Sequence, residues 1–383
     1  MKRIYFDYNA TTPVDHEVAA HVNMAFTDIF GNPSSIHEEG RKARIALDDS
    51  REEVASFLNC SCDEVIFSGS GSESNNMAIS GVAESLSHKG RHIVTTRVEH
   101  PSVKTTCMDL ELKGWKVTYL EIDPLGRINL DNLKSSIHDD TVLLSLMLAN
   151  NETGVIFPVK EAASIARERG VIVHTDAVQA VGKIEVDVQC LGVDLLSLSG
   201  HKFYAPKGVG ALYVRKGLNL KPLMHGGGQE NGKRPGTENL PGIMGLAKAA
   251  KISAEKLDEE RQRIAGLASI LKEGIKRIAH NAVFNGDPHN SVPNTLSISF
   301  RGMSGESLIM AFDLEGFALS AGSACSSGAL SPSHVLTEMG LDNDSIRGTI
   351  RLSLGRWSTE DHVNTFLKIL PSVLERQNST ANS

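Results

Sequence analysis

Apolar residues are grouped into seven short runs between residues 64 and 215. Several runs are continuous instead of alternating, which is typical of strands covered on both faces, as in a mostly parallel α/β sheet. The runs are EVIFSGS (64–70), HIVTTRV (92–98), KVTYLEI (116–122), TVLLSLML (141–148), VIVHTDA (171–177), VDLLSLS (193–199) and VGALYVR (209–215). Helical patterns separate them; segment 158–170, for example, has Pro158 near its start and Gly170 at its end.

The pattern changes after the glycine-rich segment 225–242. The elements predicted beyond it are a long helix from about Ile243 to His280 with a break near Gly274, a strand (294–300), a helix (305–314), a strand (348–354) and a final helix (359–376). Strands with segregated helices indicate a smaller α+β domain. We expect a large domain over residues 16–245 and a small domain formed by residues 1–15 and 246–383.

Composition excludes several classes of protein. The chain has 383 residues, of which 40% are hydrophobic and 22% charged, as in ordinary globular proteins. The net charge of −7 and the absence of a basic block argue against a nucleic-acid partner. No apolar run approaches the roughly 18 residues that span a bilayer, and we expect no signal peptide because residues 1–13 contain no apolar core region. The cysteines are five and scattered, which predicts a reducing, cytoplasmic setting.

Polar residues that follow the predicted strands are candidates for chemistry, because ligands of open α/β sheets bind at the carboxyl ends of the strands. After the first strand, Ser70 and Glu73 have the spacing of a capping box at a helix start. Gly71 and Ser72 would offer backbone N–H groups and a hydroxyl, which suits a phosphate. Taken alone, this segment is more commonly explained as an ordinary glycine-containing N-cap.

More polar residues follow the other strands: His100, Asn150, Asn151, Asp176, Gln179, Ser199, His201 and Lys202. An aspartate at the end of a buried strand is costly unless it meets a cation, and a lone buried lysine is usually ion-paired. Taken together, the lysine, the aspartate, the histidine and the anion cradle fit pyridoxal 5′-phosphate. That cofactor needs a lysine for its Schiff base, an acid beside its ring nitrogen and a phosphate site.

At these residues the sequence resembles the cysteine desulfurases of the NifS/IscS type, within the fold-type I, class-V aminotransferase-like enzymes. The resemblance covers nearly the whole chain, and the length of the segment around Cys325 is similar to that of the NifS/IscS branch. The motifs that carry it are YFDYNATTPV (5–14), GNPSSIH (31–37), EHPSV (99–103), ANNETG (149–154), HTDAVQAVGK (174–183), SGHKFYAPKGVGALYVR (199–215), GGGQENGKRPGTEN (226–239), GSACSSG (322–328) and IRLSLGRW (350–357). The resemblance implies a mostly parallel, mixed seven-stranded sheet flanked by helices, plus a smaller α+β domain that carries the cysteine.

The resemblance also implies roles for individual residues. Those implied at the cofactor are Lys202 (Schiff base), Asp176 (ring nitrogen), Gln179 (ring hydroxyl), His100 (ring face and proton transfer), Asn151 (cofactor and substrate), and Gly71, Ser72, Ser199 and His201 (phosphate). Thr237 would reach the phosphate in the neighbouring subunit, which implies a homodimer. Arg351 would hold the substrate carboxylate, with Asn32 as a further contact. Ser72 stands where the family often has threonine, and the hydroxyl is kept.

Cys325 lies among small residues that pack poorly and open at low cost. The resemblance implies that its thiol takes sulfur from L-cysteine as a persulfide, leaves L-alanine, and passes the sulfur to an iron–sulfur scaffold or another acceptor protein.

Other interpretations stay open at this point. They are a different pyridoxal-phosphate enzyme such as an aminotransferase or a selenocysteine lyase, a non-enzymatic sulfur-trafficking protein, and a metal hydrolase built on His100, His174 and His201. The last has no H-E-x-x-H spacing in its favour. Cys60 and Cys62 alone are too few ligands for a zinc site.

Overall fold

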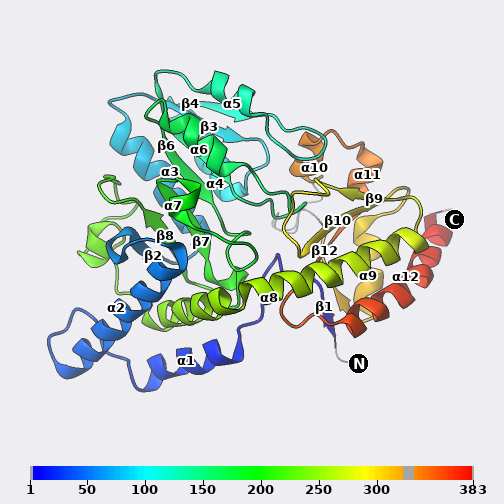
Figure 1. Cartoon of the computed structure of the whole chain (residues 1–383), viewed down its shortest axis with the longest axis horizontal. Helices are drawn as coiled ribbons and strands as arrows, with labels where there is room; N and C mark the ends of the chain where they lie inside the picture. The colour runs from blue at the N-terminus through cyan, green and yellow to red at the C-terminus, as the bar shows by residue number, and fades with distance from the viewer. Residues whose placement is uncertain (1–2, 322–331, 382–383) are drawn as a thin grey trace.

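A seven-stranded sheet forms the centre of the larger part of the molecule, in a computed structural model that describes residues 3–321 and 332–381 (Figure 1). All seven predicted strands are confirmed. In sheet order they are β2 (Val65–Ser68), β8 (Gly210–Val214), β7 (Leu195–Ser199), β6 (Ile172–Asp176), β5 (Thr141–Met147), β3 (His92–Thr96) and β4 (Lys116–Leu120). Only β8 runs antiparallel to its neighbours in this sheet. The predicted mostly parallel, mixed α/β sheet is therefore confirmed.

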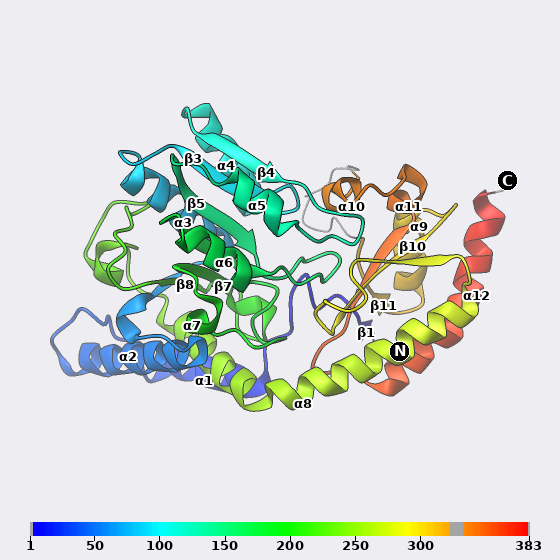
Figure 2. The same ribbon diagram turned by 45° about the horizontal axis from the view of Figure 1, so that its top comes forward.

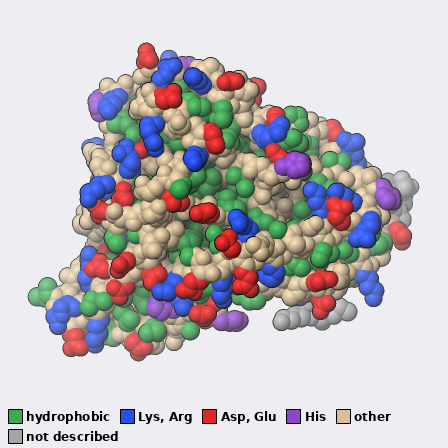
Figure 3. Space-filling view, viewed as in Figure 1, with side chains coloured by type: hydrophobic (Ala, Val, Ile, Leu, Met, Phe, Trp, Pro, Cys, Tyr) green, Lys and Arg blue, Asp and Glu red, His purple; other side chains and the backbone are tan. Residues whose placement is uncertain are grey.

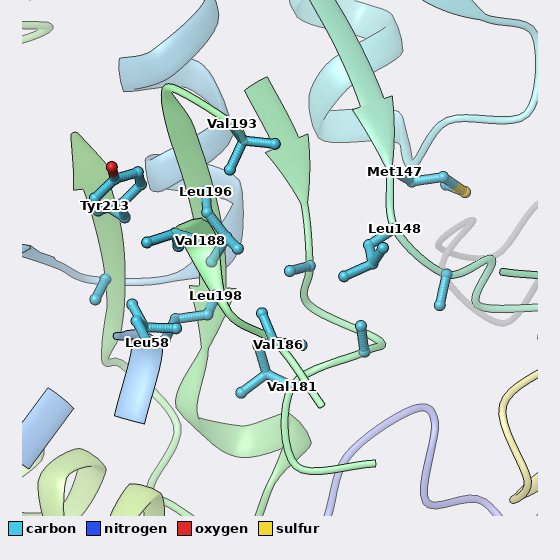
Figure 4. Packing of buried hydrophobic residues seen from close by; sticks show 14 of the residues in the cluster. Leu58, Met147, Leu148, Val181, Val186, Val188, Val193, Leu196, Leu198 and Tyr213 are labelled. Atoms are coloured by element: carbon cyan, nitrogen blue, oxygen red, sulfur yellow. The ribbon is translucent and has the colours of Figure 1, made fainter. Parts of the chain in front are cut away.

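Helices cover both faces of this sheet, which explains the continuous apolar runs. One face packs against α3 (Gly71–Leu86) and α4 (Pro101–Leu112). The other packs against α2 (Glu38–Leu58), α6 (Val159–Arg167), α7 (Val188–Leu191) and the first part of α8 (Leu240–Ile278). Adjacent residues of β7 point to opposite faces of the sheet. Leu195 lies in the apolar cluster on the side of α3 and α4, and Leu196 and Leu198 lie in the cluster on the side of α2, α6, α7 and α8. Figure 4 shows Leu196 and Leu198 together with Val186 and Val188.

A three-stranded antiparallel sheet lies in the smaller part. Its strands are β12 (Thr349–Ser353), β10 (Thr295–Phe300) and β9 (Ala282–Asn285), and its helices are α9 (Gly305–Leu314) and α12 (Glu360–Ala381). The predicted strands 294–300 and 348–354 and the helix 305–314 are confirmed, and the final helix is longer than expected. Its core is a separate apolar cluster that includes Phe6, Phe312 and Phe366.

The remaining described elements are α1 (His16–Thr27), α5 (Leu130–Ser136), α10 (His334–Glu338), α11 (Asn343–Arg347), the short strands β1 (Ile4–Tyr5) and β11 (Phe317–Ala318), and the 3-10 turns η1 (Cys62–Glu64), η2 (Gly200–Lys202) and η3 (Gln229–Gly232). Strands β1 and β11 pair in parallel, so the N-terminal segment begins against the smaller part.

Helix α8 connects the two parts, as Figure 2 shows along its lower edge. Its buried residues between 240 and 253 belong to the core beside the large sheet, and those between 264 and 275 belong to the small core. The expected break near Gly274 is wrong, because the helix is continuous there. A Cβ on Gly274 would lie 2.3 Å from a terminal methyl carbon of Leu367, so this glycine lets α12 approach closely. The domain boundary between residues 245 and 246 stays a prediction.

Two surface properties bear on the excluded classes. On the face in Figure 3, positive and negative side chains are interspersed, so that face has no patch of a single sign. Within the described ranges, no helix is both long and apolar enough to cross a membrane.

Candidate active site

A pocket of about 230 Å³ opens beside the carboxyl ends of β5, β6 and β7 and faces β12 of the small sheet. Ten of the thirteen predicted site residues line it: Gly71, Ser72, His100, Asn151, Asp176, Gln179, Ser199, His201, Lys202 and Arg351. Residues that the sequence reasoning missed also line it: Asn9, Ala10, Asn75, Ser102, Met147, Ala149 and Val178, together with the predicted helix cap Ser70. The strand-end rule therefore brings together residues between 71 and 202, and Arg351, which the resemblance implied, joins them from the small sheet.

The predicted anion cradle is the beginning of α3. Ser70 caps the helix, and its hydroxyl accepts a hydrogen bond from the Glu73 N–H at 3.1 Å. The Glu73 carboxylate reaches back one residue farther than in a regular capping box and accepts from the Gly69 N–H at 2.8 Å. A Cβ on Gly71 would lie 2.7 Å from Val178 Cγ2 and 3.2 Å from Ser199 Cβ, so glycine is needed for this close approach. The first N–H groups of the helix have no acceptor within the helix, which leaves this end suited to an anion.

Asp176 ends β6 as a buried carboxylate with neutral hydrogen-bond donors. Asn75 Nδ2 donates to it at 2.7 Å and the Val178 N–H donates at 3.0 Å. The same amide nitrogen donates to the Ser102 hydroxyl at 2.9 Å, and that hydroxyl lies 2.7 Å from Nδ1 of His100. A chain of hydrogen bonds therefore connects the aspartate to the histidine around the pocket.

The ring of His100 has a defined tautomer in its neutral form. The Ser102 backbone N–H donates to Nδ1 at 3.1 Å, and a backbone N–H cannot accept. The proton of the neutral ring therefore sits on Nε2. His100 also begins α4 as its N-cap, with Pro101 in the first helical turn, so its position is fixed by the helix start.

Lys202 lies in the 3-10 turn η2 that follows β7. Its ammonium donates to the backbone carbonyl oxygens of Asn9 at 2.7 Å and Ala10 at 2.8 Å. Burial and the positive charges of Lys202 and Lys207 lower the pKa of neighbouring His201 to about 4, so that imidazole is neutral near pH 7. Nδ1 of His201 lies 3.1 Å from the Thr11 hydroxyl. The N-terminal segment therefore contacts both Lys202 and His201.

Arg351 projects from β12 toward this pocket and is only 1% exposed. Its guanidinium donates to Asp7 Oδ1 at 2.8 Å, to the Ser320 hydroxyl at 2.7 Å and to the Asn151 carbonyl at 3.0 Å. Its buried Nε has no hydrogen-bond partner among the described residues. An unpaired buried donor is costly, so the guanidinium lacks one acceptor in this arrangement.

Asn9 connects the two sides of the pocket, and no local pattern in the sequence indicated this. It is 1% exposed, and its Nδ2 donates to the Thr295 hydroxyl at 2.8 Å and to the Asn151 carbonyl at 3.1 Å. Its backbone carbonyl accepts from Lys202 and from Gln179 Nε2, the latter at 2.9 Å. The signal that could have indicated it was its place in the N-terminal motif that carries the family resemblance.

Three predicted site residues do not line the pocket of this chain. Thr237 is exposed, and Asn32 is exposed between α1 and α2, where its side chain accepts from the Ser34 N–H. Cys325 lies outside the described residues.

The described residues on both sides of Cys325 contact residues around the pocket. On one side, Ser320 bonds Arg351 and Asp7. On the other, the Ser333 hydroxyl donates to the buried Glu152 carboxylate at 2.5 Å, and burial raises the pKa of Glu152. The ring of His334 lies 3.1 Å from the carbonyl of Glu99, whose own pKa burial raises to about 8.

In the part of the chain that the structure describes, no group of three or more His, Cys, Asp or Glu residues is placed to hold a metal ion. His174 lies instead between the hydroxyls of Ser145 and Ser197, and burial lowers its pKa to about 3.

The pocket fits pyridoxal 5′-phosphate in its donor set. It holds a lysine amine, a buried carboxylate and the start of a sixteen-residue helix. Two buried polar atoms of its lining, Asn75 Oδ1 and Arg351 Nε, have no partner among the described residues. The pocket is thus already polar where a charged ligand would need partners.

The family model and the sequence relatives agree on which proteins this chain is similar to. The model of the aminotransferase class-V family matches residues 4–366. A cysteine desulfurase IscS from Dictyoglomus turgidum is 46% identical over 377 residues, which is 98% of this chain and 96% of the relative. Another from Methanosarcina thermophila is 44% identical over 375 residues, which is 98% of this chain and 93% of the relative.

Solved structures agree with these relatives. A NifS-like protein superposes with a TM-score of 0.93 at 39% identity, covering 98% of this chain and all of the other. The structure of SspA in complex with cysteine superposes with a TM-score of 0.82 at 36% identity, covering 93% of this chain and all of the other.

Proposed function

This chain belongs to the aminotransferase class-V family, and on that premise we propose that it is a cysteine desulfurase. It converts L-cysteine to L-alanine with pyridoxal 5′-phosphate and retains the sulfur on Cys325. The observation that carries the proposal is the gathering of Lys202, Asp176 and the start of α3 at one pocket, opposite Arg351. The relatives named as cysteine desulfurases support the choice of reaction within the family.

The residues that would hold the cofactor surround the pocket. They are Lys202 for its aldehyde, Asp176 for the ring nitrogen, Gln179 for the ring hydroxyl, His100 for the ring face, Asn151 for a further contact, and Gly71, Ser72, Ser199 and His201 for the phosphate. When bound, pyridoxal phosphate supplies an electron sink for charge that develops at the substrate Cα. Asp176 accepts hydrogen bonds from Asn75 Nδ2 and the Val178 N–H, and it would stabilise a proton on the ring nitrogen.

Arg351 would hold the α-carboxylate of the substrate. A guanidinium is permanently charged and binds a carboxylate at two points. Its contacts with Asp7, Ser320 and Asn151 fix its direction, and its unpaired Nε supplies a donor. Asn151 and Asn32 are proposed as additional contacts, the latter from an exposed segment.

Lys202 and His100 would move protons. Lys202 takes the Cα proton, for which its position between the pocket and the carbonyls of Asn9 and Ala10 is suitable. Neutral His100 carries its proton on Nε2, so it can donate one to a group in the pocket.

Cys325 would take the sulfur. Its thiolate attacks the substrate sulfur, the substrate Cβ–S bond breaks, and the electron pair passes to the substrate carbon, which takes up protons to become alanine. The product on the enzyme is a persulfide, so one sulfur atom moves from substrate to Cys325. The contacts of Ser320 and Ser333 with residues around the pocket support the proposal, because they bring both flanks of the segment close to it.

The test measures products from L-cysteine with the purified protein loaded with pyridoxal phosphate. Cys325→Ala should abolish alanine formation while the cofactor stays bound, because the sulfur acceptor is gone. Lys202→Ala is the matched variant, and it should remove the covalent link trapped by borohydride reduction. Normal alanine formation by Cys325→Ala would contradict the assignment of Cys325, and keto-acid production from cysteine would favour an aminotransferase.

We also propose a homodimer. Large apolar side chains are exposed on and beside α1 and α2: Met24, Phe26, Phe30, Ile36 and Ile45. Thr237 lies outside its own pocket and would reach the cofactor phosphate of the partner. Sedimentation should give twice the chain mass of 41.3 kDa, and a monomer would contradict this.

The acceptor of the sulfur is proposed to be an iron–sulfur scaffold or another sulfur-carrying protein in the cytoplasm. The scattered cysteines are consistent with a reducing compartment.

We further propose the division into a large domain (16–245) and a small domain (1–15 and 246–383), for which the separate apolar cluster of the smaller part is the support.

A further inference from the structure

Lys183 is a basic side chain beside the pocket that the proposed reaction does not use. It lies in the turn after β6, four residues beyond Gln179. Its Nζ donates to Gln179 Oε1 at 2.5 Å and to Asn9 Oδ1 at 2.9 Å. Lys202 contacts the backbone carbonyl of the same asparagine, so the two lysines approach Asn9 from different atoms.

The turn is built for this contact. The N–H groups of Lys183 and Ile184 both donate to the Ala180 carbonyl, which makes a helical turn and puts residues 179 and 183 on one side. Gly182 has φ of +73°, and a Cβ there would lie 2.7 Å from Phe203 Cβ. The glycine therefore allows the chain to turn tightly enough to aim Lys183 at Gln179.

A lysine at this place determines which way two amides face. An amide has one end that donates and one that accepts, whereas an ammonium only donates. Gln179 Oε1 and Asn9 Oδ1 must therefore face Lys183, and Gln179 Nε2 must face the Asn9 carbonyl beside the pocket. Burial and the charges of Lys202 and Arg351 lower the pKa of Lys183, but the neutral amine still has two N–H groups for the two oxygens, and the Asn9 carbonyl, which only accepts, favours Gln179 Nε2 on its own side.

We propose that Lys183 is a positioning residue that fixes the Gln179 amide with its N–H groups toward the cofactor. This rests on the proposed function, in which Gln179 donates to the ring hydroxyl of pyridoxal phosphate. With Lys183 lost, Gln179 Nε2 keeps the Asn9 carbonyl as acceptor but Oε1 loses its donor, so the amide is held at one end only and its N–H groups are aimed less firmly at the ring oxygen. Asn9 keeps a second donor to its Oδ1, Asn294 Nδ2 at 3.0 Å, so Gln179 is the more affected of the two.

The test compares Lys183→Met with wild type in two readouts other than turnover. The first is the dissociation constant for pyridoxal phosphate, which should rise about tenfold, as for loss of one oriented hydrogen bond to a charged group. The second is the pH titration of the visible absorbance of the bound cofactor. Its apparent pKa should rise, because the donor that stabilises the deprotonated ring oxygen is no longer held in place.

A double-mutant cycle separates orientation from charge and from folding. In a Gln179→Met background, no amide remains to orient. Lys183→Met should therefore change the dissociation constant less than twofold and leave the apparent pKa nearly unchanged. Lys216→Met is the matched control, because it removes a lysine whose side chain is 77% exposed, and it should leave both readouts unchanged. Lys183→Gln, which can donate and accept, replaces Lys183→Met if that variant does not fold, and it should give a smaller change in the same direction.

Two results would overturn the proposal. One is an unchanged titration and affinity in the Lys183 variants, and the other is an equal change with and without Gln179. Failure of the wild-type protein to bind pyridoxal phosphate at all would instead contradict the proposed function, so the two failures are distinguishable.

Discussion

The two sides of the pocket are held in different ways. On the side of the large sheet, Asp176, Ser199 and Lys202 stand at or just beyond the ends of adjacent strands, within the same sheet edge. On the opposite side, Arg351 and Asn9 depend on contacts between the two ends of the chain, through Asp7, Ser320 and Ser353. The first side is a property of one sheet, and the second is a property of how separate segments meet.

This difference assigns different tasks to the two sides in the proposed enzyme. The sheet side supplies the groups for the cofactor, which stays bound between turnovers. The other side supplies the group for the substrate carboxylate, which enters and leaves. Variants on the two sides should therefore separate cofactor affinity from substrate affinity.

Arg351→Lys is expected to have the largest effect among the variants that separate substrate affinity from cofactor affinity. The lysine keeps the charge but loses the two-point geometry, so KM for L-cysteine should rise about 10- to 100-fold, as for loss of one or two hydrogen bonds to a charged group. The affinity for pyridoxal phosphate should change little. Steady-state kinetics and cofactor titration measure the two.

The control for this variant is Arg301→Lys, whose side chain is 58% exposed and does not line the pocket. It should behave as wild type. An equal loss of cofactor and substrate affinity in Arg351→Lys would show that the two sides are not separable.

A smaller effect is expected from His174, which lies in β6 on the sheet side. It concerns the pH dependence of the free energy of unfolding. The pKa of His174 is lowered to about 3 by burial, whereas the unfolded chain has about 6.5. Below pH 6.5 the unfolded state binds a proton that the folded state does not, so stability from this group is lost as pH falls. The slope is about 1.4 kcal/mol per pH unit between these values.

Urea unfolding of wild type and His174→Gln at pH 7, 6 and 5 measures this slope. Glutamine retains a donor and an acceptor for Ser145 and Ser197 but does not titrate. The free energy of unfolding of wild type should therefore fall more steeply than that of the variant. Parallel curves would mean that His174 does not contribute to the pH dependence.

The sheet side of the pocket was predicted best from the sequence, because it belongs to one sheet whose strands follow local patterns. Strand patterns and the rule for strand ends depend on local periodicity, and they predicted all seven strands and most of the pocket lining. Sequence reasoning did not find Asn9, Asn75 or Lys183 as hydrogen-bonding partners, because those contacts depend on which distant segments meet. Gly274 shows another limit, since a glycine in a helix permits a break or a close approach, and only packing decides between them.

The meeting of the two chain ends has a consequence for biosynthesis. Residues 65–214 contain every strand of the large sheet, so the cofactor side can be complete while the rest of the chain is still being made. Asn9 cannot bond Ser353, and Asp7 cannot pair with Arg351, until more than 340 further residues have been synthesised. The segment around Asp7 and Asn9 thus leaves the ribosome long before its partners exist, and the substrate side of the pocket is finished only after residue 353 has been made.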